Sequence, residues 1–212
     1  RKMLIVNPIE VVVREIPSDE QRLFESLAED ERAYAATLAA NRRREWVAWR
    51  ALLRERAERW GVGEQALRVA YAPSGEPLFE GLEGSISVTH SRRFVALARS
   101  WQGRCGIDIE QLDRNFERVE NKYISPAEQQ LPTVDDERFR AAVWCAKEAM
   151  FKCVGREGVD FCRDLQLTEV DFESDSVRGT AFGVPLGGVI QQLDGAILVA
   201  ISPTSDEHFI FI

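Results

Sequence analysis

The sequence has 212 residues, of which 45% are apolar and 29% are charged, and its formal net charge is −8. This is the composition of a globular protein, and the negative charge argues against nucleic-acid binding driven by overall charge. No apolar run approaches the roughly 18 residues of a membrane span, and no basic segment followed by a long apolar run opens the sequence. We therefore expect a cytoplasmic protein without a secretory signal or a membrane partner.

The first part of the chain is predicted to contain a strand and two helical regions. β-Branched residues favour a strand over residues 4–13. Ser18, with Gln21 three residues later, has the spacing of a helix start, and helix is expected from there to about residue 40. A second helix is expected over residues 41–60. Its apolar side chains recur at helical spacing: Trp46, Trp49, Leu53 and Trp60.

Beyond Gly63 the apolar period changes to two residues, which is typical of strands. Strands are expected over residues 85–89, 94–98 and 105–110. The connections between them are short, so they are predicted to form an antiparallel meander. In such a meander His90, at the end of the first strand, can lie close to the acids of the third strand.

The second half is predicted to contain helices and then a sheet. Ser125 and the proline after it resemble a helix start, and a long helix is expected over residues 135–154, closed at Gly155. Asp194 and Gly195 form a two-residue hairpin signal. Strands are expected over residues 165–172, 177–182, 189–193, 196–202 and, at the edge, 208–212.

The order of these elements predicts an α+β fold. Each half reads as helices followed by a small antiparallel sheet, although no residue-level repeat relates the halves. No linker-like segment separates them, so we expect two similar α+β units, residues 1–103 and 104–212, packed together.

The strand over residues 105–110 reads CGIDIE and places two acids on one face. Side chains alternate along a strand, so Asp108 and Glu110 point the same way. Adjacent carboxylates repel unless a cation or a proton lies between them, and Mg²⁺ is the usual ion where phosphate oxygens complete the site. The alternative is a solvent-facing strand with two incidental acids. The four cysteines form no CxxC pair, which argues against zinc.

Two further patterns carry charge. In the helix over residues 135–154, Glu148, Lys152 and Trp144 share one face, whereas Lys147 is turned away from Glu148 by about 100°. The alternative is a surface ion pair of small energetic value. The arginine cluster over residues 42–44 suits a small anion, or else forms a solvated helix face.

Four segments resemble the motifs of the 4′-phosphopantetheinyl transferases, in their monomeric, surfactin-synthetase-activating (Sfp-like) branch. The family signature is G-[IV]-D-x-E followed by W-x-x-K-E-[AS]-x-x-K, and the chain carries CGIDIE and then WCAKEAMFK at residues 144–152. Residues 87–91, SVTHS, are similar to the family's N-[IL]-S-H-S. Residues 42–50, RRREWVAWR, are similar to R-x-x-E-[FW]-x-x-x-R.

The resemblance implies a Mg²⁺-dependent enzyme, with Mn²⁺ as the alternative ion. Such an enzyme moves the 4′-phosphopantetheine group of coenzyme A onto a serine of an apo acyl or peptidyl carrier protein and releases 3′,5′-ADP. The resemblance also implies a monomer with two pseudo-two-fold halves and the active site in the cleft between them. The expected role is in fatty acid, polyketide or nonribosomal peptide biosynthesis, with the carrier docking mainly on the second half.

The resemblance further implies which residues act. Asp108, Glu110 and Glu148 match the metal ligands, and Glu148 matches the position proposed to accept the serine proton. Lys152 is expected to join Glu148 in catalysis by steadying the phosphate on the leaving side. The expected contacts with coenzyme A are Arg42, Arg50, His90, Lys147 and Lys152.

The sequence departs from the family pattern and leaves other hypotheses open. The turn over residues 74–77, SGEP, lacks the lysine found there in many relatives, so one phosphate contact is missing or supplied by another arginine. Thr89 replaces a serine. The competing hypotheses are a Mg²⁺-dependent phosphoesterase and a non-catalytic relative that binds coenzyme A or a carrier. His90 alone would also suit a structural turn.

Overall fold

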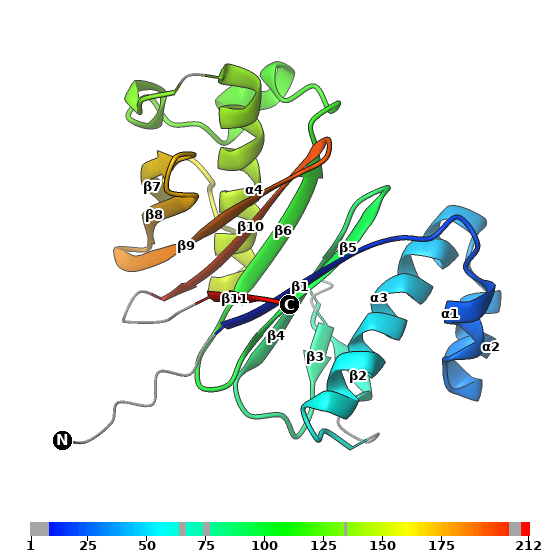
Figure 1. The fold of residues 1–212 in the computed structure, drawn as a ribbon. Helices are drawn as coiled ribbons and strands as arrows, with labels where there is room; N and C mark the ends of the chain where they lie inside the picture. Colours follow the sequence, from blue (N-terminus) through cyan, green and yellow to red (C-terminus); the bar gives the residue numbers. More distant parts are fainter. Residues whose placement is uncertain (1–8, 64–66, 74–76, 134, 204–208) are drawn as a thin grey trace.

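The computed structural model describes residues 9–63, 67–73, 77–133, 135–203 and 209–212. In these ranges the chain is a mixed α/β fold with two main sheets, each covered by one long helix (Figure 1). The predicted strand start at residues 4–8, the turn at residues 74–76 and the strand start at His208 lie outside the described residues. Within the described ranges, no helix combines the length and the apolar character that crossing a bilayer requires.

The first sheet has four strands in the order β11-β1-β5-β4. Their bounds are Phe209–Phe211, Ile9–Glu15, Phe94–Ser100 and Ser85–His90. The C-terminal strand β11 pairs in parallel with β1, so the last residues of the chain complete the sheet of the first half. A separate antiparallel pair, β2 (Val69–Tyr71) and β3 (Pro77–Phe79), was not predicted from the sequence.

The second sheet has five antiparallel strands in the order β6-β10-β9-β8-β7. Their bounds are Gly106–Gln111, Ala196–Pro203, Val184–Leu193, Ser176–Ala181 and Leu165–Asp171. The predicted turn at Asp194 and Gly195 joins β9 to β10, and Gly195 takes a positive φ of 68°. The predicted three-strand meander is wrong, because β4 and β5 pair with each other whereas β6 pairs with β10.

The two long helices lie where they were predicted. Helix α3 spans Ala40–Arg59 and helix α4 spans Asp136–Val154. The Asp135 side chain accepts a hydrogen bond from the Arg138 N–H at the start of α4, and Gly155 ends the helix at a positive φ of 60°.

The shorter helices differ from the prediction. The first helical region is two helices, α1 (Gln21–Glu25) and α2 (Glu29–Ala36), and Ser18 does not cap it. Helix α2 begins separately from α1, and at its start the Glu31 carboxylate accepts a hydrogen bond from the Ala28 N–H at 2.9 Å. After Ser125 the chain forms only a short 3₁₀ turn, Glu128–Gln130, and a second 3₁₀ helix, Glu117–Lys122, was not predicted.

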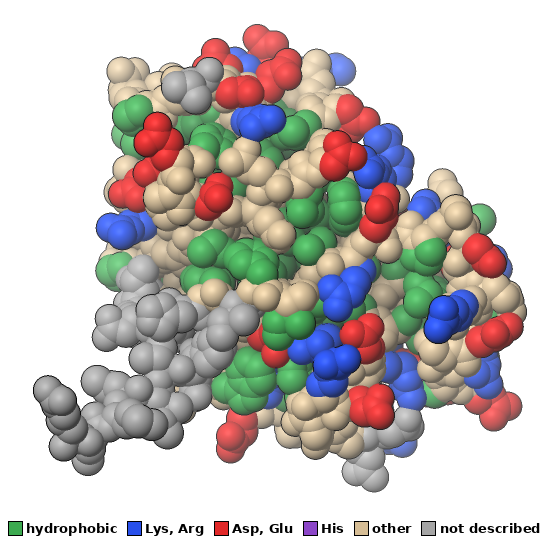
Figure 2. All heavy atoms as spheres, in the orientation of Figure 1, with side chains coloured by type: hydrophobic (Ala, Val, Ile, Leu, Met, Phe, Trp, Pro, Cys, Tyr) green, Lys and Arg blue, Asp and Glu red, His purple; other side chains and the backbone are tan. Residues whose placement is uncertain are grey.

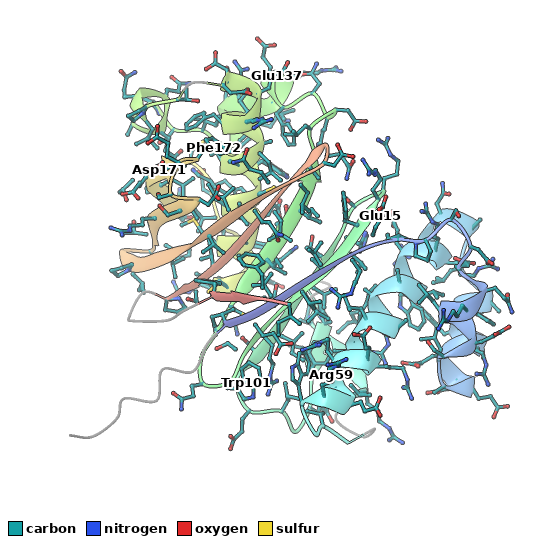
Figure 3. All side chains as sticks on the ribbon, in the orientation of Figure 1. Glu15, Arg59, Trp101, Glu137, Asp171 and Phe172 are labelled. Atoms are coloured by element: carbon teal, nitrogen blue, oxygen red, sulfur yellow. The ribbon has the colours of Figure 1, made fainter. Side chains whose placement is uncertain are left out.

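Three apolar layers hold the sheets and the long helices together, and a fourth, smaller apolar cluster packs α2 against α3. Neighbouring strand residues face opposite sides, so Val12 of β1 packs under α3 whereas Val11 packs between the two sheets. Ile107 and Ile109 of β6 fill this central layer from the second sheet. The opposite face of the second sheet packs against α4, and side chains fill the space between them (Figure 3). Acidic and basic side chains are interspersed over the face drawn in Figure 2.

A row of hydroxyl groups joins β4 to β6 where the two sheets meet. The backbone N–H groups of Cys105, Ile107 and Ile109 donate to the side-chain oxygens of Ser85, Ser87 and Thr89, at 3.0, 3.1 and 3.3 Å. These bonds replace a backbone ladder between the strands. They explain why small polar residues alternate along β4, and they place the end of β4 beside the acids of β6.

Candidate functional site

The acids of β6 face helix α4 because they share a strand face with Gly106, which lies directly against the helix. A Cβ added to Gly106 would lie 1.8 Å from the Ala149 carbonyl oxygen, so only glycine fits at this position. The isoleucines of β6 turn to the central layer. Asp108 and Glu110, on the alternate face, meet side chains of α4: Asp108 binds Lys152 and Glu110 binds Trp144. The alternation of the strand predicted that the two acids share a face.

Asp108 is buried, and its two carboxylate oxygens differ. Oδ1 accepts from Lys152 Nζ at 2.9 Å and from Thr89 Oγ1 at 3.1 Å. Oδ2 is buried and has no hydrogen-bond partner among the described residues. A buried carboxylate oxygen without a donor is costly, and a cation beside it would remove that cost.

Glu110 is held by two groups that lie close together. Its Oε1 accepts from Trp144 Nε1 at 2.9 Å and from Arg114 Nη1 at 2.6 Å. The Arg114 guanidinium carbon lies 5.1 Å from the Trp144 ring centroid. Burial raises the pKa of Glu110, the charge of Asp108 adds to this rise, and Arg114 opposes it.

Glu148 completes the set of acids from α4. Burial raises the pKa of Glu148, and the charges of Asp108 and Glu110 raise it further, while Lys152 opposes the rise. The three acids thus lie within electrostatic reach of one another. In the described parts of the chain, however, no three His, Cys, Asp or Glu side chains are placed as a ready metal-binding group. The donor chemistry fits a divalent cation, but the side chains would have to move to form its coordination sphere.

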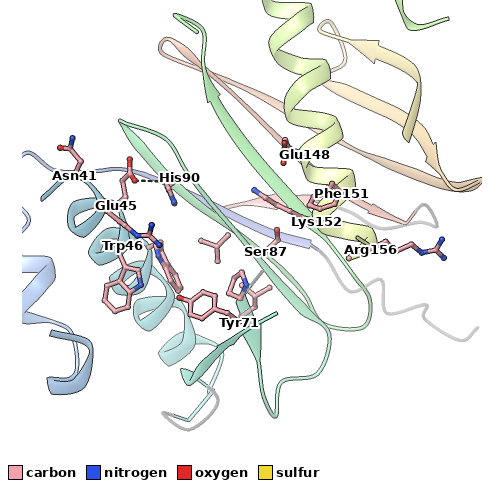
Figure 4. Close-up of a pocket in the computed structure, with 16 residues that line it drawn as sticks. Asn41, Glu45, Trp46, Tyr71, Ser87, His90, Glu148, Phe151, Lys152 and Arg156 are labelled. Carbon is pink, nitrogen blue, oxygen red and sulfur yellow. Dashed lines mark ion pairs between the residues drawn. The ribbon is translucent and has the colours of Figure 1, made fainter. Parts of the chain in front are cut away.

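A pocket with a volume of about 670 Å³ opens beside these acids, between α3, β4 and the end of α4 (Figure 4). Its basic lining residues are Arg42, His90, Lys152 and Arg156, and its aromatic ones include Trp46, Trp49 and Tyr71. Glu148 also lines it. The Arg156 side chain extends away from the pocket in Figure 4, and its guanidinium carbon lies 4.4 Å from the Phe182 ring centroid.

His90 faces Glu45, an acid of the segment RRREWVAWR for which the sequence predicted no role. Its Nδ1 lies 3.5 Å from Glu45 Oε2, the ion pair drawn as a dashed line in Figure 4. Burial lowers the pKa of His90, the charge of Glu45 opposes this, and Lys152 adds to the lowering. Glu45 follows Arg42 by three residues and so shares its helix face, a spacing that could have identified it.

Arg50 lies outside the pocket, although it was predicted to contact coenzyme A. It is buried, and its guanidinium donates to Glu31 Oε1, with Nε at 2.8 Å, and to the Leu67 carbonyl at 3.0 Å. The guanidinium carbon lies 5.1 Å from the Trp49 ring centroid. This placement argues against a phosphate contact, because the charge is already paired in the interior.

Lys147 was also predicted to contact coenzyme A, and it is fully buried on the side of α4 away from the pocket. Its Nζ donates to the Glu128 carboxylate at 2.8 Å and to the Phe161 carbonyl at 2.6 Å. Burial lowers the pKa of Lys147, and Glu128 opposes the effect. This placement argues against the predicted ligand contact.

The structure thus divides the predicted residues into three groups. The pocket is lined by Arg42, His90, Glu148 and Lys152. Asp108, which binds Lys152, lies one contact behind it. Glu110 binds Trp144 and Arg114, which are not among the lining residues of the pocket. Arg50 and Lys147 are buried in separate ion pairs. Arg114, which binds Glu110, was missed because nothing in its spacing distinguishes it from a solvated arginine.

Comparison with known proteins concerns the second half. Residues 104–185 match the family model of the 4′-phosphopantetheinyl transferase superfamily. The matched segment includes β6 and α4, with all three acids, and it is less than half of the chain. Comparison with curated proteins gives no significant match. The match supports the superfamily resemblance of this segment and phosphopantetheinyl transfer as its general reaction class, and the Sfp-like branch stays a prediction.

Proposed function

We propose that this protein transfers the 4′-phosphopantetheine group of coenzyme A to a serine of an apo carrier protein and releases 3′,5′-ADP. The observation that carries the proposal is that Arg42 and His90 of the first half line the same pocket as Glu148 and Lys152 of the second. The superfamily match of residues 104–185 supports it independently. The proposal includes two similar halves with the active site between them, acting as a monomer.

The pocket suits the nucleotide part of coenzyme A. Arg42 and Lys152 provide positive charge for its phosphates, and His90 provides a ring N–H that can donate a hydrogen bond to them. Aromatic side chains such as Trp46 and Trp49 provide flat apolar surface for its adenine. A volume of about 670 Å³ lies within the range of roughly 300–1,000 Å³ that ligand pockets usually have.

The proposed metal ligands are Asp108, Glu110 and Glu148, with Mg²⁺ as the expected ion and Mn²⁺ as the alternative. The Oδ2 atom of Asp108, which has no hydrogen-bond partner in the described part of the chain, and the raised pKa values of the other two carboxyls support this set. When bound, the ion would offset the charge of the pyrophosphate oxygens. Lys152, which now pairs with Asp108, would then be free to bind a phosphate oxygen.

Glu148 is the proposed general base. The serine oxygen forms a bond to the phosphorus that bears the pantetheine, the bond from this phosphorus to 3′,5′-ADP breaks, and Glu148 takes the serine proton. A carboxylate within hydrogen-bond reach of the serine hydroxyl can accept its proton as a general base. Lys152 would steady the charge that develops on the leaving phosphate.

Mass spectrometry of carrier proteins tests this proposal. The purified protein, with Mg²⁺ and coenzyme A, is expected to add the mass of one phosphopantetheine group to at least one apo carrier among fatty-acid, polyketide and peptide-synthetase types. Folded protein that modifies none of them would refute the transfer. Hydrolysis of coenzyme A without a carrier would instead favour the phosphoesterase hypothesis. Coenzyme A binding without either reaction would favour the non-catalytic one.

A further inference from the structure

The buried pair of Lys147 and Glu128 leaves a question about the W-x-x-K-E segment. Lys147 precedes the proposed base Glu148 on α4, yet its side chain reaches a different part of the molecule. Both partners of the pair are fully buried. An interior lysine of this kind persists only where its charge is matched, so its role must be sought among the groups that it holds.

The Glu128 carboxylate ties three segments of the second half together. Its Oε2 accepts from Lys147 Nζ at 2.8 Å and from the Ser125 N–H at 2.7 Å. Its Oε1 accepts from the Leu167 N–H at 2.7 Å. The pair thus connects α4 with the 3₁₀ turn at Glu128 and with the start of β7, and the carboxylate has donors on both oxygens.

The other bond of Lys147 fixes an aromatic cluster. Its Nζ donates to the Phe161 carbonyl at 2.6 Å. The Phe161 ring centroid lies 5.9 Å from that of Trp144 and 5.8 Å from that of Phe151. Trp144 also makes an edge contact with Tyr123, at 5.1 Å between ring centroids. The lysine therefore holds the backbone of the residue whose ring packs against Trp144.

Trp144 connects the aromatic cluster with the proposed metal ligand Glu110. Its Nε1 donates to Glu110 Oε1 at 2.9 Å, so the orientation of the indole sets the orientation of the carboxylate. We propose that Lys147 is a positioning residue: together with Glu128 it holds Phe161 against Trp144, and thereby holds Trp144 in the orientation that binds Glu110. The role rests on the proposed function of Glu110 and gives Lys147 no contact with coenzyme A.

Nuclear magnetic resonance tests the link without turnover. The chain has five tryptophans, and Trp144→Phe identifies the Trp144 indole N–H resonance by its loss. Lys147→Met and Glu128→Gln are each expected to shift this resonance, whereas Arg178→Gln, on the exposed outer face of β8, leaves it in place. Phe161→Leu keeps the carbonyl that Lys147 binds but removes the ring, and it is expected to shift the resonance even if Lys147→Met does not fold.

Kinetics and binding complete the test. Residues that support a metal ligand typically contribute about 10–100-fold to activity, so Lys147→Met and Phe161→Leu are expected to lower kcat by that factor and to leave coenzyme A affinity unchanged. The Lys147→Met/Glu128→Gln double variant, which leaves no unpaired charge, is expected to unfold at a higher temperature than Lys147→Met alone.

The opposite pattern would overturn the proposal. A folded Lys147→Met protein with an unmoved Trp144 resonance and weakened coenzyme A binding would make Lys147 a ligand contact. An unmoved resonance in Phe161→Leu would likewise break the link. If the unchanged protein modifies no carrier, the proposed function fails, while the indole resonance still decides whether Lys147 orients Trp144.

Discussion

Each of the two long helices places one basic residue in the pocket wall and buries another in an ion pair. On α3, Arg42 lines the pocket while Arg50, two turns later, is buried against Glu31. On α4, Lys152 lines the pocket while Lys147 is buried against Glu128. In both helices the buried cation is paired away from the pocket, whereas Lys152 pairs with Asp108 and still lines the pocket. The comparison teaches that burial away from the pocket, and neither the residue type nor the presence of a distant acid, separates a structural ion pair from a candidate ligand contact.

The largest expected effect concerns the pocket side of α4. Glu148→Gln removes the proposed base and keeps the shape of the side chain. General base catalysis typically contributes about 10²–10⁴-fold, so the rate of carrier modification is expected to fall by that factor. Single-turnover kinetics measures it, with the thermal midpoint as the control for folding. A variant as fast as the unchanged protein would remove Glu148 from the mechanism.

A substitution on the buried side of α3 is expected to lower the stability of the protein. Arg50→Met leaves Glu31 with Arg54 as its remaining cation, and breaking a buried pair by removing one partner costs about 3–5 kcal/mol. We expect a loss near 3 kcal/mol in urea unfolding and unchanged coenzyme A affinity in the folded fraction. Weakened coenzyme A binding at unchanged stability would instead show that Arg50 contacts the ligand.

Substitution of Arg42 is expected to weaken coenzyme A binding and to leave the stability unchanged. Arg42→Gln removes a charge that lines the pocket, and a hydrogen bond to a charged group is worth about 1.5–3 kcal/mol. Isothermal titration calorimetry is expected to show coenzyme A affinity reduced roughly tenfold or more at unchanged stability. Arg43→Gln is the matched control, because Arg43 pairs with Glu20 away from the pocket. Equal effects of the two variants would count against a specific role of Arg42.

The smallest expected effect is on the titration of His90. Burial lowers the pKa of His90 and Glu45 raises it, so Glu45→Gln is expected to lower this pKa further. His90 then loses its proton at a lower pH than in the unchanged protein. The chain has two histidines, and His90→Asn assigns the signal in a proton NMR titration. An unchanged or raised pKa would show that the Glu45 contact does not act on His90 in solution.

Much of the fold followed from local patterns. The helices α3 and α4, the glycine that ends α4, and the hairpin between β9 and β10 lie where capping and periodicity placed them. The partner of β6 could not be predicted in this way. The chain turns from β5 into β6 over a short connection, as in a hairpin, yet β6 bonds to β10, about 90 residues away, because its isoleucines fill the layer between the sheets.

The candidate site, like the fold, could be predicted only where local spacing decides the arrangement. The alternation of β6 and the helical spacing of α4 predicted that Asp108 and Glu110 share a face and that Glu148 and Lys152 share another. The contacts of Asp108 with Lys152 and of Glu110 with Trp144 bring these two faces together. The burial of Arg50 and Lys147 was missed because it depends on Glu31 and Glu128. Each of these acids lies on another element, so no local spacing connects them with their partners.

The most direct test of the central claim compares Asp108→Ala with the unchanged protein in carrier modification followed by mass spectrometry. The matched control is Asp113→Ala, since Asp113 is exposed and pairs only with Arg92 among the ion pairs of the described residues. We expect a phosphopantetheine adduct with the unchanged protein and with Asp113→Ala, and none with folded Asp108→Ala. An adduct formed at the full rate by Asp108→Ala would contradict the account.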